Sequence, residues 1–447
     1  MFKRIATTLF ALSLILNAGT FDIRSEKRTI NASQRLTKIE NVKAEWSGRE
    51  VYKPLPKEFS GSMMPYDFSL CDTVVAWDNS LQPVFVSYVA RHGARYLTSP
   101  KKIEMIADAL NEAEGKGMLS AEGLEMLRFI REISQKSEGK WGLLSSVGVE
   151  EEETLGKDMA KMLPKLFKRG EAVAESTYVP RVIMTMYQFM HALEIPNQRL
   201  ELYASSGHQY DSLLRCFSKN KEYSAYRDKG EWQNAYDEFV QRHVSSDPAR
   251  RLFAEGYKED RPELRNLTMS LYGLIQSLEA SGLAKATTKF MSEQEYQGCW
   301  LASNLQHYLR NNINMVSAVA GTATAPLLDR IMKDADTALS SGNCKLRGYF
   351  GHAETVLPLY SLMNLPGCSL MTDDYDKLAD VWRVQDIAPL GANLAIILLK
   401  GKKGEIYASL RLNGRNIKPL PGKGEIVKWT DLKKYWSERI EEFSDKR

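Results

Sequence analysis

The hydrophobic positions along the chain change their spacing several times, and each change predicts a different kind of element. Residues 82–90 form a nearly continuous apolar run rich in β-branched and aromatic side chains, which is typical of a buried strand. The residues after this run repeat apolar side chains every three or four positions, as amphipathic helices do. We expect helices over 102–114, 121–134, 151–168 and 181–193, and short strands over 176–179 and 198–204.

From about residue 208 to residue 340 the pattern is helical, and strand-like stretches almost disappear. Helices are expected over 231–244, 263–280, 292–310 and 325–339. Strands are expected again over 345–350, 393–399 and 405–412. The pair Asn413-Gly414, which follows the last strand, is a strong signal for a tight turn. The pattern therefore predicts an α/β protein with a helical insertion between two parts of its α/β domain.

The same pattern divides the chain into five stretches. They are a targeting segment over 1–19, a polar lead-in over 20–60, the first part of the α/β domain over 61–204, the helical insertion over 205–340 and the second part of the α/β domain over 341–447.

The targeting segment has the layout of a signal peptide. Lys3 and Arg4 precede the apolar segment 5–16, and the small residues Ala18 and Gly19 follow it, as cleavage requires. The apolar segment is too short to span a bilayer comfortably, so we expect no stable membrane span after cleavage. An uncleaved anchor stays open as an alternative. The mature protein is expected to be periplasmic or secreted.

Composition and charge narrow the classes of partner. The formal net charge is +4, and removing Lys3 and Arg4 lowers it by two, to +2. Bulk charge therefore favours no nucleic-acid partner, and any attraction for anions must be local. The five cysteines have no metal-like spacing. In an exported protein they can form one or two disulfides, or several can be buried as small hydrophobic residues.

The most specific chemical signal is the pentapeptide Arg91-His92-Gly93-Ala94-Arg95, which directly follows the first predicted strand. The carboxyl ends of strands are where α/β sheets present their ligand sites. The planar forks of two guanidinium groups match phosphate oxygens, and the glycine lets the backbone turn sharply. A histidine held between these arginines faces a phosphorus atom as a nucleophile.

A second motif, His352-Ala353-Glu354, also lies where a predicted strand gives way to a helix. Two such positions on neighbouring strands converge on one cleft, where a phosphate also meets a helix amino terminus. Glu354 lies two residues beyond His352, and in an extended turn such residues point the same way. Its carboxyl group is therefore a candidate donor of a proton to a leaving oxygen.

Other charged positions are weaker signals. Arg181 opens a predicted helix, so its head group would lie at the helix amino end beside any bound anion, although such an arginine alone is usually a solvated charge. The acidic run Glu150–Glu153 is predicted to be a solvated first turn favoured by the helix dipole, not a metal site. No metal-binding motif occurs, so neither a metal nor a cofactor is expected. Four further histidines are predicted to be structural, namely His191, His208, His243 and His307. The prediction is least clear for His208.

The three motifs in this order resemble the histidine acid phosphatase branch of the phosphoglycerate mutase-like superfamily. Most members have His-Asp in the second motif, whereas His352-Ala-Glu354 is the variant of the multiple inositol polyphosphate phosphatases. Tyr96 and the segment 410–422 are also similar to that subfamily. The resemblance runs from about residue 80 to about 425 and is thin in the helical insertion. It implies a phosphoglycerate mutase-like α/β domain with a helical inserted domain.

The resemblance also implies roles for individual residues. His92 would attack phosphorus to form a phosphohistidine, and Glu354 would protonate the departing inositol oxygen. The phosphoryl group would be held by Arg91, Arg95, Arg181 and His352. Thr98 is a further candidate contact, although Leu97 replaces the usual proline before it. Candidate contacts to outlying phosphates are Lys101, Lys102 and Arg215, although each is more often just a solvated charge.

The motif residues would contact only one phosphoryl group, so they do not identify the rest of the substrate. The favoured interpretation is an exported phosphatase that acts on inositol polyphosphates, with phytate as the leading candidate. One alternative is a histidine acid phosphatase of broad specificity or one for sugar phosphates. Another is a non-catalytic polyanion-binding protein, but pure binding needs the arginines more than it needs the intact His92 and Glu354.

Overall fold

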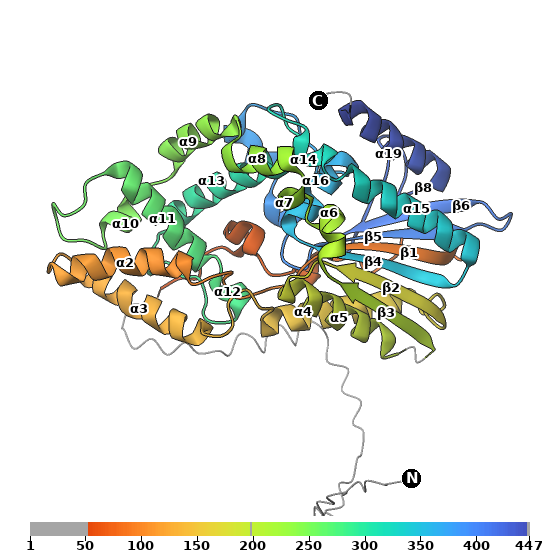
Figure 1. Ribbon diagram of the computed structural model, residues 1–447, viewed down its shortest axis with the longest axis horizontal. Coiled ribbons are helices and arrows are strands. Elements are labelled where there is room, and N and C mark those ends of the chain that lie inside the picture. The colour runs from red at the N-terminus through yellow and green to blue at the C-terminus, as the bar shows by residue number, and fades with distance from the viewer. Residues whose placement is uncertain (1–51, 197–198, 445–447) are drawn as a thin grey trace, which may run out of the picture. The chain divides into compact units, whose positions relative to one another are not determined.

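The computed structural model describes residues 52–196 and 199–444, and an eight-stranded sheet lies at its centre (Figure 1). The strands are β1 (Gln82–Arg91), β2 (Gly170–Ser176), β3 (Leu200–Ser206), β4 (Cys344–Gly351), β5 (Asn393–Lys400), β6 (Ile406–Leu412), β7 (Arg415–Ile417) and β8 (Ile426–Lys428). Their order is β3-β2-β4-β1-β5-β6-β7, and β8 pairs with β6. The four strands from β3 to β1 are parallel, and the remaining pairings are antiparallel. The predicted α/β class is confirmed.

Helices cover both faces of the sheet, so its central strand β1 is buried on each side. The helices below the sheet in Figure 1 are α4 (Ser146–Met162) and α5 (Pro180–Glu194), and those above it are α15 (Ala325–Ser341), α16 (Ala353–Leu362) and α19 (Trp429–Ser444). Along β1, Val86 and Tyr88 join the core with α4 and α5, whereas Phe85 and Val89 join the core on the opposite face. Burial on both faces explains why β1 is a continuous apolar run and not an alternating one.

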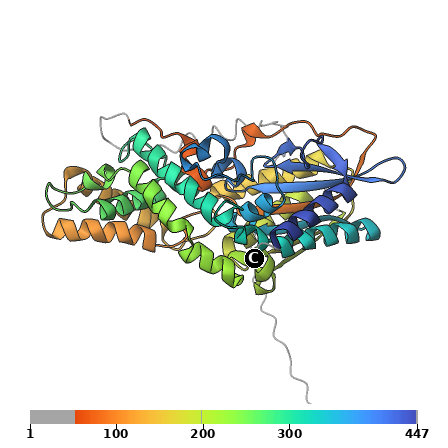
Figure 2. The same ribbon diagram turned by 90° about the horizontal axis from the view of Figure 1, so that it is seen from above.

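The chain between β3 and α15 is helical, as the periodicity predicts. Its helices are η3 (His208–Tyr210), α6 (Asp211–Leu214), α7 (Cys216–Lys219), α8 (Lys221–Lys229), α9 (Trp232–His243), α10 (Asp247–Arg250), α11 (Arg261–Ile275), α12 (Leu278–Ser281), α13 (Glu293–Asn311) and α14 (Val319–Thr322). Two helices from before β2, α2 (Lys101–Gly115) and α3 (Ala121–Ser137), lie at the same end as α10 and α11 in Figures 1 and 2. The short elements elsewhere are η1 (Lys57–Met63), η2 (Phe68–Leu70), η4 (Tyr375–Lys377), α17 (Leu378–Val381) and α18 (Val384–Ile387). The predicted domain boundaries remain predictions.

Two predicted elements are displaced. The strand expected over 176–179 is wrong, because β2 ends at Ser176. The alanine-rich sequence of β2 gives a weak strand pattern. The β-branched residues after β2 gave a stronger one, because they precede Pro180, which favours extended backbone in the residue before it. The helix expected over 151–168 begins earlier and ends at Met162. Ser145 caps its start through the Gly148 N–H, and the apolar residues beyond its end are buried in a turn.

The Asn413-Gly414 turn is confirmed and joins β6 to β7. Both residues have positive φ, 49° and 75°, as a two-residue hairpin of the twist-matched kind requires. The Asn413 side-chain amide also donates to the carbonyl oxygens of Asp386 and Ile387. The turn is therefore fixed to the segment before β5.

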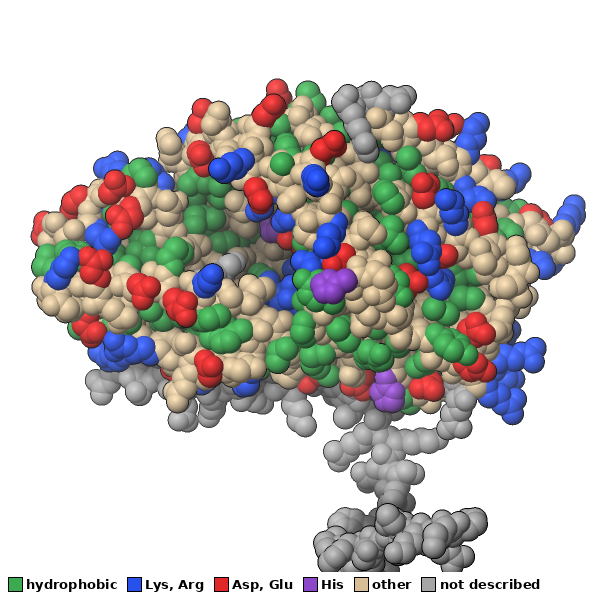
Figure 3. Space-filling model, in the orientation of Figure 1, with side chains coloured by type: hydrophobic (Ala, Val, Ile, Leu, Met, Phe, Trp, Pro, Cys, Tyr) green, Lys and Arg blue, Asp and Glu red, His purple; other side chains and the backbone are tan. Residues whose placement is uncertain are grey.

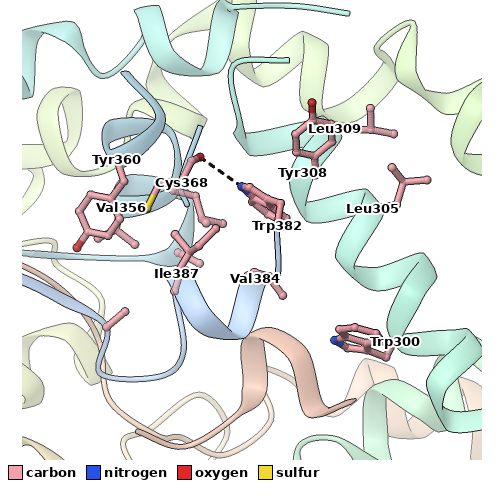
Figure 4. Close-up of a cluster of buried hydrophobic side chains, with 14 of the residues drawn as sticks. Trp300, Leu305, Tyr308, Leu309, Val356, Tyr360, Cys368, Trp382, Val384 and Ile387 are labelled. Atoms are coloured by element: carbon pink, nitrogen blue, oxygen red, sulfur yellow. Dashed lines mark hydrogen bonds between the residues drawn. The ribbon is translucent and has the colours of Figure 1, made fainter. Parts of the chain in front are cut away.

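An aromatic cluster between α13 and α16 supports the helix that carries the second motif (Figure 4). Tyr308 of α13 packs against Trp382 with ring centroids 5.4 Å apart, and Tyr360 and Val356 of α16 lie on the other side of the cluster. The indole N–H of Trp382 donates to the carbonyl oxygen of Cys368 at 3.3 Å. Because every member is buried, α16 has a rigid base behind its amino end.

The structure pairs none of the five cysteines, so no disulfide forms in it. Cys216, Cys299 and Cys368 are buried, in agreement with the alternative that treats them as small hydrophobic residues. Within residues 52–196 and 199–444, no helix is long and apolar enough to cross a membrane. The predicted signal peptide and most of the lead-in lie outside the described residues.

Two helical glycines give a matched test of how α4 packs on the first motif. A Cβ at Gly148 in α4 would lie 2.1 Å from the carbonyl oxygen of Ala94, whereas a Cβ at Gly273 in α11 meets nothing within 4 Å. We expect Gly148→Ala to lower the free energy of unfolding by about 1–3 kcal/mol through overpacking. Gly273→Ala should raise it by about 0.5–1 kcal/mol through helix propensity. Denaturant unfolding measures both changes, and a Gly148→Ala protein as stable as Gly273→Ala would contradict this packing.

Candidate active site

The two motifs lie side by side because their strands are parallel neighbours. In the β1–β4 register Arg91 is opposite Gly351, so both strands end at the same edge. The backbone N–H of His92 donates to the carbonyl oxygen of Gly351 at 3.1 Å. The imidazole rings of His92 and His352 face each other nearly edge-on, with centroids 5.7 Å apart. The predicted convergence of the two motifs on one site is confirmed.

His92 is 3% exposed and has one ring nitrogen already bound. Its Nδ1 lies 3.0 Å from the carbonyl oxygen of Gly93, which can only accept, so Nδ1 carries the proton and Nε2 keeps a free lone pair. Burial first, and then the nearby arginines led by Arg181, hold the pKa of His92 well below its ordinary value. The imidazole is therefore neutral, with the tautomer that a nucleophile at Nε2 needs.

The arginines of the first motif are fixed by backbone carbonyls. Nη1 of Arg91 donates to the carbonyl oxygens of Ser62 and Ala388, both at 2.6 Å. Nη1 of Arg95 donates to the carbonyl oxygen of Tyr96 at 2.9 Å. Burial, with repulsion from neighbouring guanidinium groups, lowers the pKa of Arg91 to about 10 and that of Arg95 to about 9. Both groups are held in place without a carboxylate partner, which leaves their charge for a ligand.

Arg181 lies in the first turn of α5, where the helix dipole already favours an anion. Its Nη2 is 3.5 Å from Nδ1 of His352, and Nε2 of His352 is 3.3 Å from Oγ1 of Thr177. Burial, followed by the charge of Arg181, lowers the pKa of His352 to about 3. His352 is therefore a neutral ring between an arginine and a hydroxyl, at contacts long enough to rearrange around a bound oxyanion.

Glu354 reaches the site from a helix and not from an extended turn. His352 has extended backbone and caps α16, but Glu354 lies in the first helical turn, so the expected alternation over two residues is wrong. Oε1 of Glu354 pairs with Nη2 of Arg227 at 3.2 Å. Partial burial acts to raise the pKa of Glu354, but Arg227 and other nearby groups lower it to about 2. The carboxyl group is therefore ionised in the unliganded site.

The site contains more positive charge than the motifs suggest. Arg227 of α8 and Arg310 of α13 join Arg215, and all three lie within electrostatic range of Glu354 or His352. Throughout the described ranges 52–196 and 199–444, the arginines whose buried Nε–H lacks a hydrogen-bond partner are Arg91, Arg95, Arg181, Arg215, Arg227 and Arg310. Since an unsatisfied buried donor is costly, this set of donors fits a ligand with many acceptor oxygens.

His307 of α13, which the sequence predicts to be structural, lies within electrostatic range of Glu354. Burial first lowers its pKa, to about 4, and Glu354 opposes that change by attraction. The signal that was available is its spacing of three residues from Arg310, which places both side chains on one face of a helix. No comparable local signal marks Arg227.

A hollow opens in this face of the molecule, near the middle of the view in Figure 3. Lysine or arginine atoms and histidine atoms lie inside it, and hydrophobic side chains surround parts of its rim. Clefts lined by one sign of charge attract oppositely charged ligands strongly. The hollow is therefore suited to a polyanion.

The sequence matches the family model of the histidine phosphatase superfamily (branch 2) over residues 84–413. The chain belongs to that superfamily. The predicted family is thus confirmed, and the chain is a phosphomonoester hydrolase. No curated protein sequence matches it significantly.

Solved structures of other proteins share the fold. The multiple inositol polyphosphate phosphatase of Bifidobacterium longum, in complex with inositol hexasulfate, superposes with a TM-score of 0.70 at 14% identity, over 84% of this chain and 97% of that one. The same protein in complex with phosphate gives 0.70 at 15% identity, over 85% and 97%. The phytase from D. castellii gives 0.65 at 16% identity, over 86% and 85%. At these identities the likeness concerns the fold.

In the acidic run beside the first motif of this histidine phosphatase, Glu150 is exposed as predicted, but the next two glutamates are not solvated. Glu151 is 4% exposed and Glu152 is fully buried. Glu151 accepts the backbone N–H groups of Tyr66 and Ala94, both at 2.7 Å. The prediction of a solvated turn is therefore wrong for Glu151 and Glu152. The donors to Glu151 come from chain segments that no helical periodicity can reveal.

Among the described side chains, the structure shows no contact between the remaining candidates and the two histidine motifs. The side chain of Thr98 is exposed, and so is that of Lys101 at the start of α2, while the side chain of Lys102 lies outside the described part of the chain. His208 packs against Tyr178 with the two rings tilted, and its Nδ1 lies 2.9 Å from Oδ2 of Asp211. In residues 52–196 and 199–444, no group of three or more His, Cys, Asp or Glu side chains is arranged to hold a metal ion.

Proposed function

We propose that this histidine phosphatase is exported and hydrolyses phosphomonoesters of inositol polyphosphates, with phytate as its leading substrate. The observation that carries the proposal is the set of buried, unpartnered guanidinium N–H groups around a neutral histidine. Three of these arginines, Arg91, Arg95 and Arg181, suffice for one phosphoryl group. The others, Arg215, Arg227 and Arg310, supply donors for additional phosphates on the same small molecule.

In the first chemical step, Nε2 of His92 attacks phosphorus and an N–P bond forms. Arg91, Arg95 and Arg181 bind the non-bridging oxygens and stabilise the charge that develops on them during in-line transfer. His352 and the amino end of α16 add donors on the same side. The bond from phosphorus to the inositol oxygen breaks, and its electron pair leaves with that oxygen.

Glu354 delivers the proton that the departing oxygen needs. In the free site its pKa is about 2, so it is ionised and paired with Arg227. A substrate phosphate that binds Arg227 competes for this guanidinium and brings negative charge close to the carboxylate. Both effects raise the pKa of Glu354, so Glu354 becomes protonated when the substrate binds.

In the second step a water molecule hydrolyses the phosphohistidine. Glu354 has given up its proton and is a base again, so it accepts a proton from the attacking water. The N–P bond breaks, its electrons return to Nε2 of His92, and inorganic phosphate leaves. No metal ion takes part in this sequence.

Export rests on residues 1–19, whose basic start, apolar segment and small residues have the layout of a signal peptide. The periplasm or the medium is accordingly its proposed place of action.

Substrate class is tested by kcat/KM for phytate, a sugar monophosphate and an activated aryl phosphate, without added metal. We expect wild-type protein to favour phytate, because only phytate can engage the outer arginines. Arg310→Gln should lower kcat/KM for phytate by about 10- to 100-fold, as the loss of a charge-assisted hydrogen bond implies, and lower that for the aryl phosphate less. Arg169→Gln is the matched control, since Arg169 is exposed just before β2 at the opposite edge of the sheet.

Equal efficiency on all three substrates would favour a broad-specificity phosphatase. Tight phytate binding with no phosphate release from any substrate would favour a polyanion-binding protein. A preference for the sugar phosphate would place the chain among sugar-phosphate histidine acid phosphatases.

Glu354→Gln separates the acid role from binding. The amide cannot donate a proton to an alkoxide, so kcat for phytate, whose leaving oxygen is strongly basic, should fall by about 10²- to 10⁴-fold. An aryl phosphate with a weakly basic leaving group should be slowed far less. Steady-state kinetics with a series of phosphate esters measures the difference, and equal slowing across the series would rule out the acid role.

A further inference from the structure

The buried acidic pair behind the first motif has no part in the mechanism above, yet it touches the nucleophile's own loop. Glu151 and Glu152 lie side by side in α4, and both are almost completely buried. A Cβ at Gly93 would lie 3.0 Å from Oε1 of Glu152 and 3.3 Å from Oε2 of Glu151. The glycine next to His92 therefore gives both carboxyl groups room to approach the motif.

The two carboxyl groups differ in how they are satisfied. Each oxygen of Glu151 accepts a backbone N–H, from Tyr66 and from Ala94. Neither oxygen of Glu152 has a hydrogen-bond partner among the described residues. Burial raises the pKa of Glu151 to about 7, while the two N–H donors and Arg91 oppose that rise. Burial and the neighbouring Glu151 raise the pKa of Glu152 well above its ordinary value. Because both oxygens of Glu151 accept N–H groups and neither oxygen of Glu152 does, we assign the negative charge to Glu151 and the proton to Glu152.

A single peptide group connects Glu151 to the nucleophile. The peptide between Gly93 and Ala94 donates its N–H to Oε2 of Glu151 at 2.7 Å. Its carbonyl oxygen faces Nδ1 of His92 at 3.0 Å. A hydrogen bond at one end of an amide polarises the group and strengthens the bond at its other end. The carboxylate thus acts on the imidazole through the backbone, much as a directly bonded aspartate acts on the histidine of a hydrolase triad.

We propose that Glu151 is a positioning residue for phosphoryl transfer, which fixes and polarises the Gly93–Ala94 peptide and through it the tautomer and orientation of His92. This inference rests on the proposed function. When Nε2 forms its bond to phosphorus, the ring becomes a cation that keeps its proton on Nδ1. The carboxylate charge, relayed through the peptide, stabilises that cation while the N–P bond exists. When the bond breaks, its electron pair returns to Nε2 and the ring is neutral again. Atoms and protons balance without any further reactant.

Glu151→Gln tests the relay because it keeps the size of the side chain. Its amide nitrogen cannot accept an N–H, so one of the two backbone bonds is lost. With an aryl phosphate in rapid-quench experiments, we expect phosphorylation of His92 to slow by about 10- to 100-fold, with KM changed far less. The ¹H–¹⁵N resonance of the His92 Nδ1–H should move upfield, a change that a purely structural role of Glu151 does not predict.

Glu150→Gln is the matched control, since Glu150 is the exposed neighbour in the same helix and should leave rate and resonance unchanged. If Glu151→Gln does not fold, as thermal melting shows, Glu151→Asp replaces it. Aspartate keeps the charge, but its side chain is shorter by one methylene, so the carboxylate lies farther from the Gly93–Ala94 peptide. We expect a smaller decrease in rate and a smaller upfield shift than for Glu151→Gln. An unchanged rate and resonance in whichever variant folds would overturn the relay.

Failure of the proposed function looks different. If wild-type protein releases phosphate from no phosphomonoester, the function is wrong, whatever the variants do. If wild-type protein is active and Glu151→Gln matches it in rate and resonance, only the relay is wrong.

Discussion

The active site depends on the parallel pairing of β1 with β4. A register in which Arg91 is opposite Gly351 brings two motifs more than two hundred residues apart in sequence to the same sheet edge. A shift of this register by one residue would turn the buried side chains of β1 toward the wrong face, so the two-sided core fixes it. The strand pairing therefore fixes the relative positions of the two motifs, although their histidines lie just beyond the ends of the strands.

The charges gathered at this edge are costly until a ligand arrives. Burial and mutual repulsion lower the pKa values of Arg91 and Arg95, and guanidinium N–H groups remain unsatisfied. Donors that are already fixed in place can stabilise a phosphoryl transition state without reorganisation. Their cost in folding free energy is offset by the large cores on both faces of the sheet. Two glutamates lie close to these groups: Glu354 pairs with Arg227, and Glu151 accepts the backbone N–H of Ala94.

Local patterns in the sequence predicted the parts of the site that adjoin regular elements. The apolar pattern marks where the strands and helices begin and end. Both histidine motifs and Arg181 lie at such ends, so the pattern also located them. Arg227 and Arg310 escaped prediction because α8 and α13 bring them in from the helical segment, and a single arginine in an amphipathic helix resembles any solvated charge.

The acidic run shows the opposite error. Four glutamates at a helix start match a solvated, dipole-favoured turn, and only contacts 57 and 85 residues away make Glu151 a buried acceptor. Helix α19 was missed although Trp429, Leu432 and Trp436 have helical spacing and are buried. Its signal was local and available. The buried glutamates required knowledge of which backbone donors lie across the fold.

The most direct test of phosphoryl transfer through His92 is to trap the covalent intermediate. Wild-type protein is mixed with excess phytate, quenched in alkali within one turnover, digested and analysed by mass spectrometry. We predict a phosphoryl group on the imidazole of His92, lost on acid treatment and absent from His92→Ala protein that still binds inorganic phosphate. Full phosphate release by His92→Ala, or turnover in wild-type protein with phosphate trapped on another residue, would contradict the mechanism.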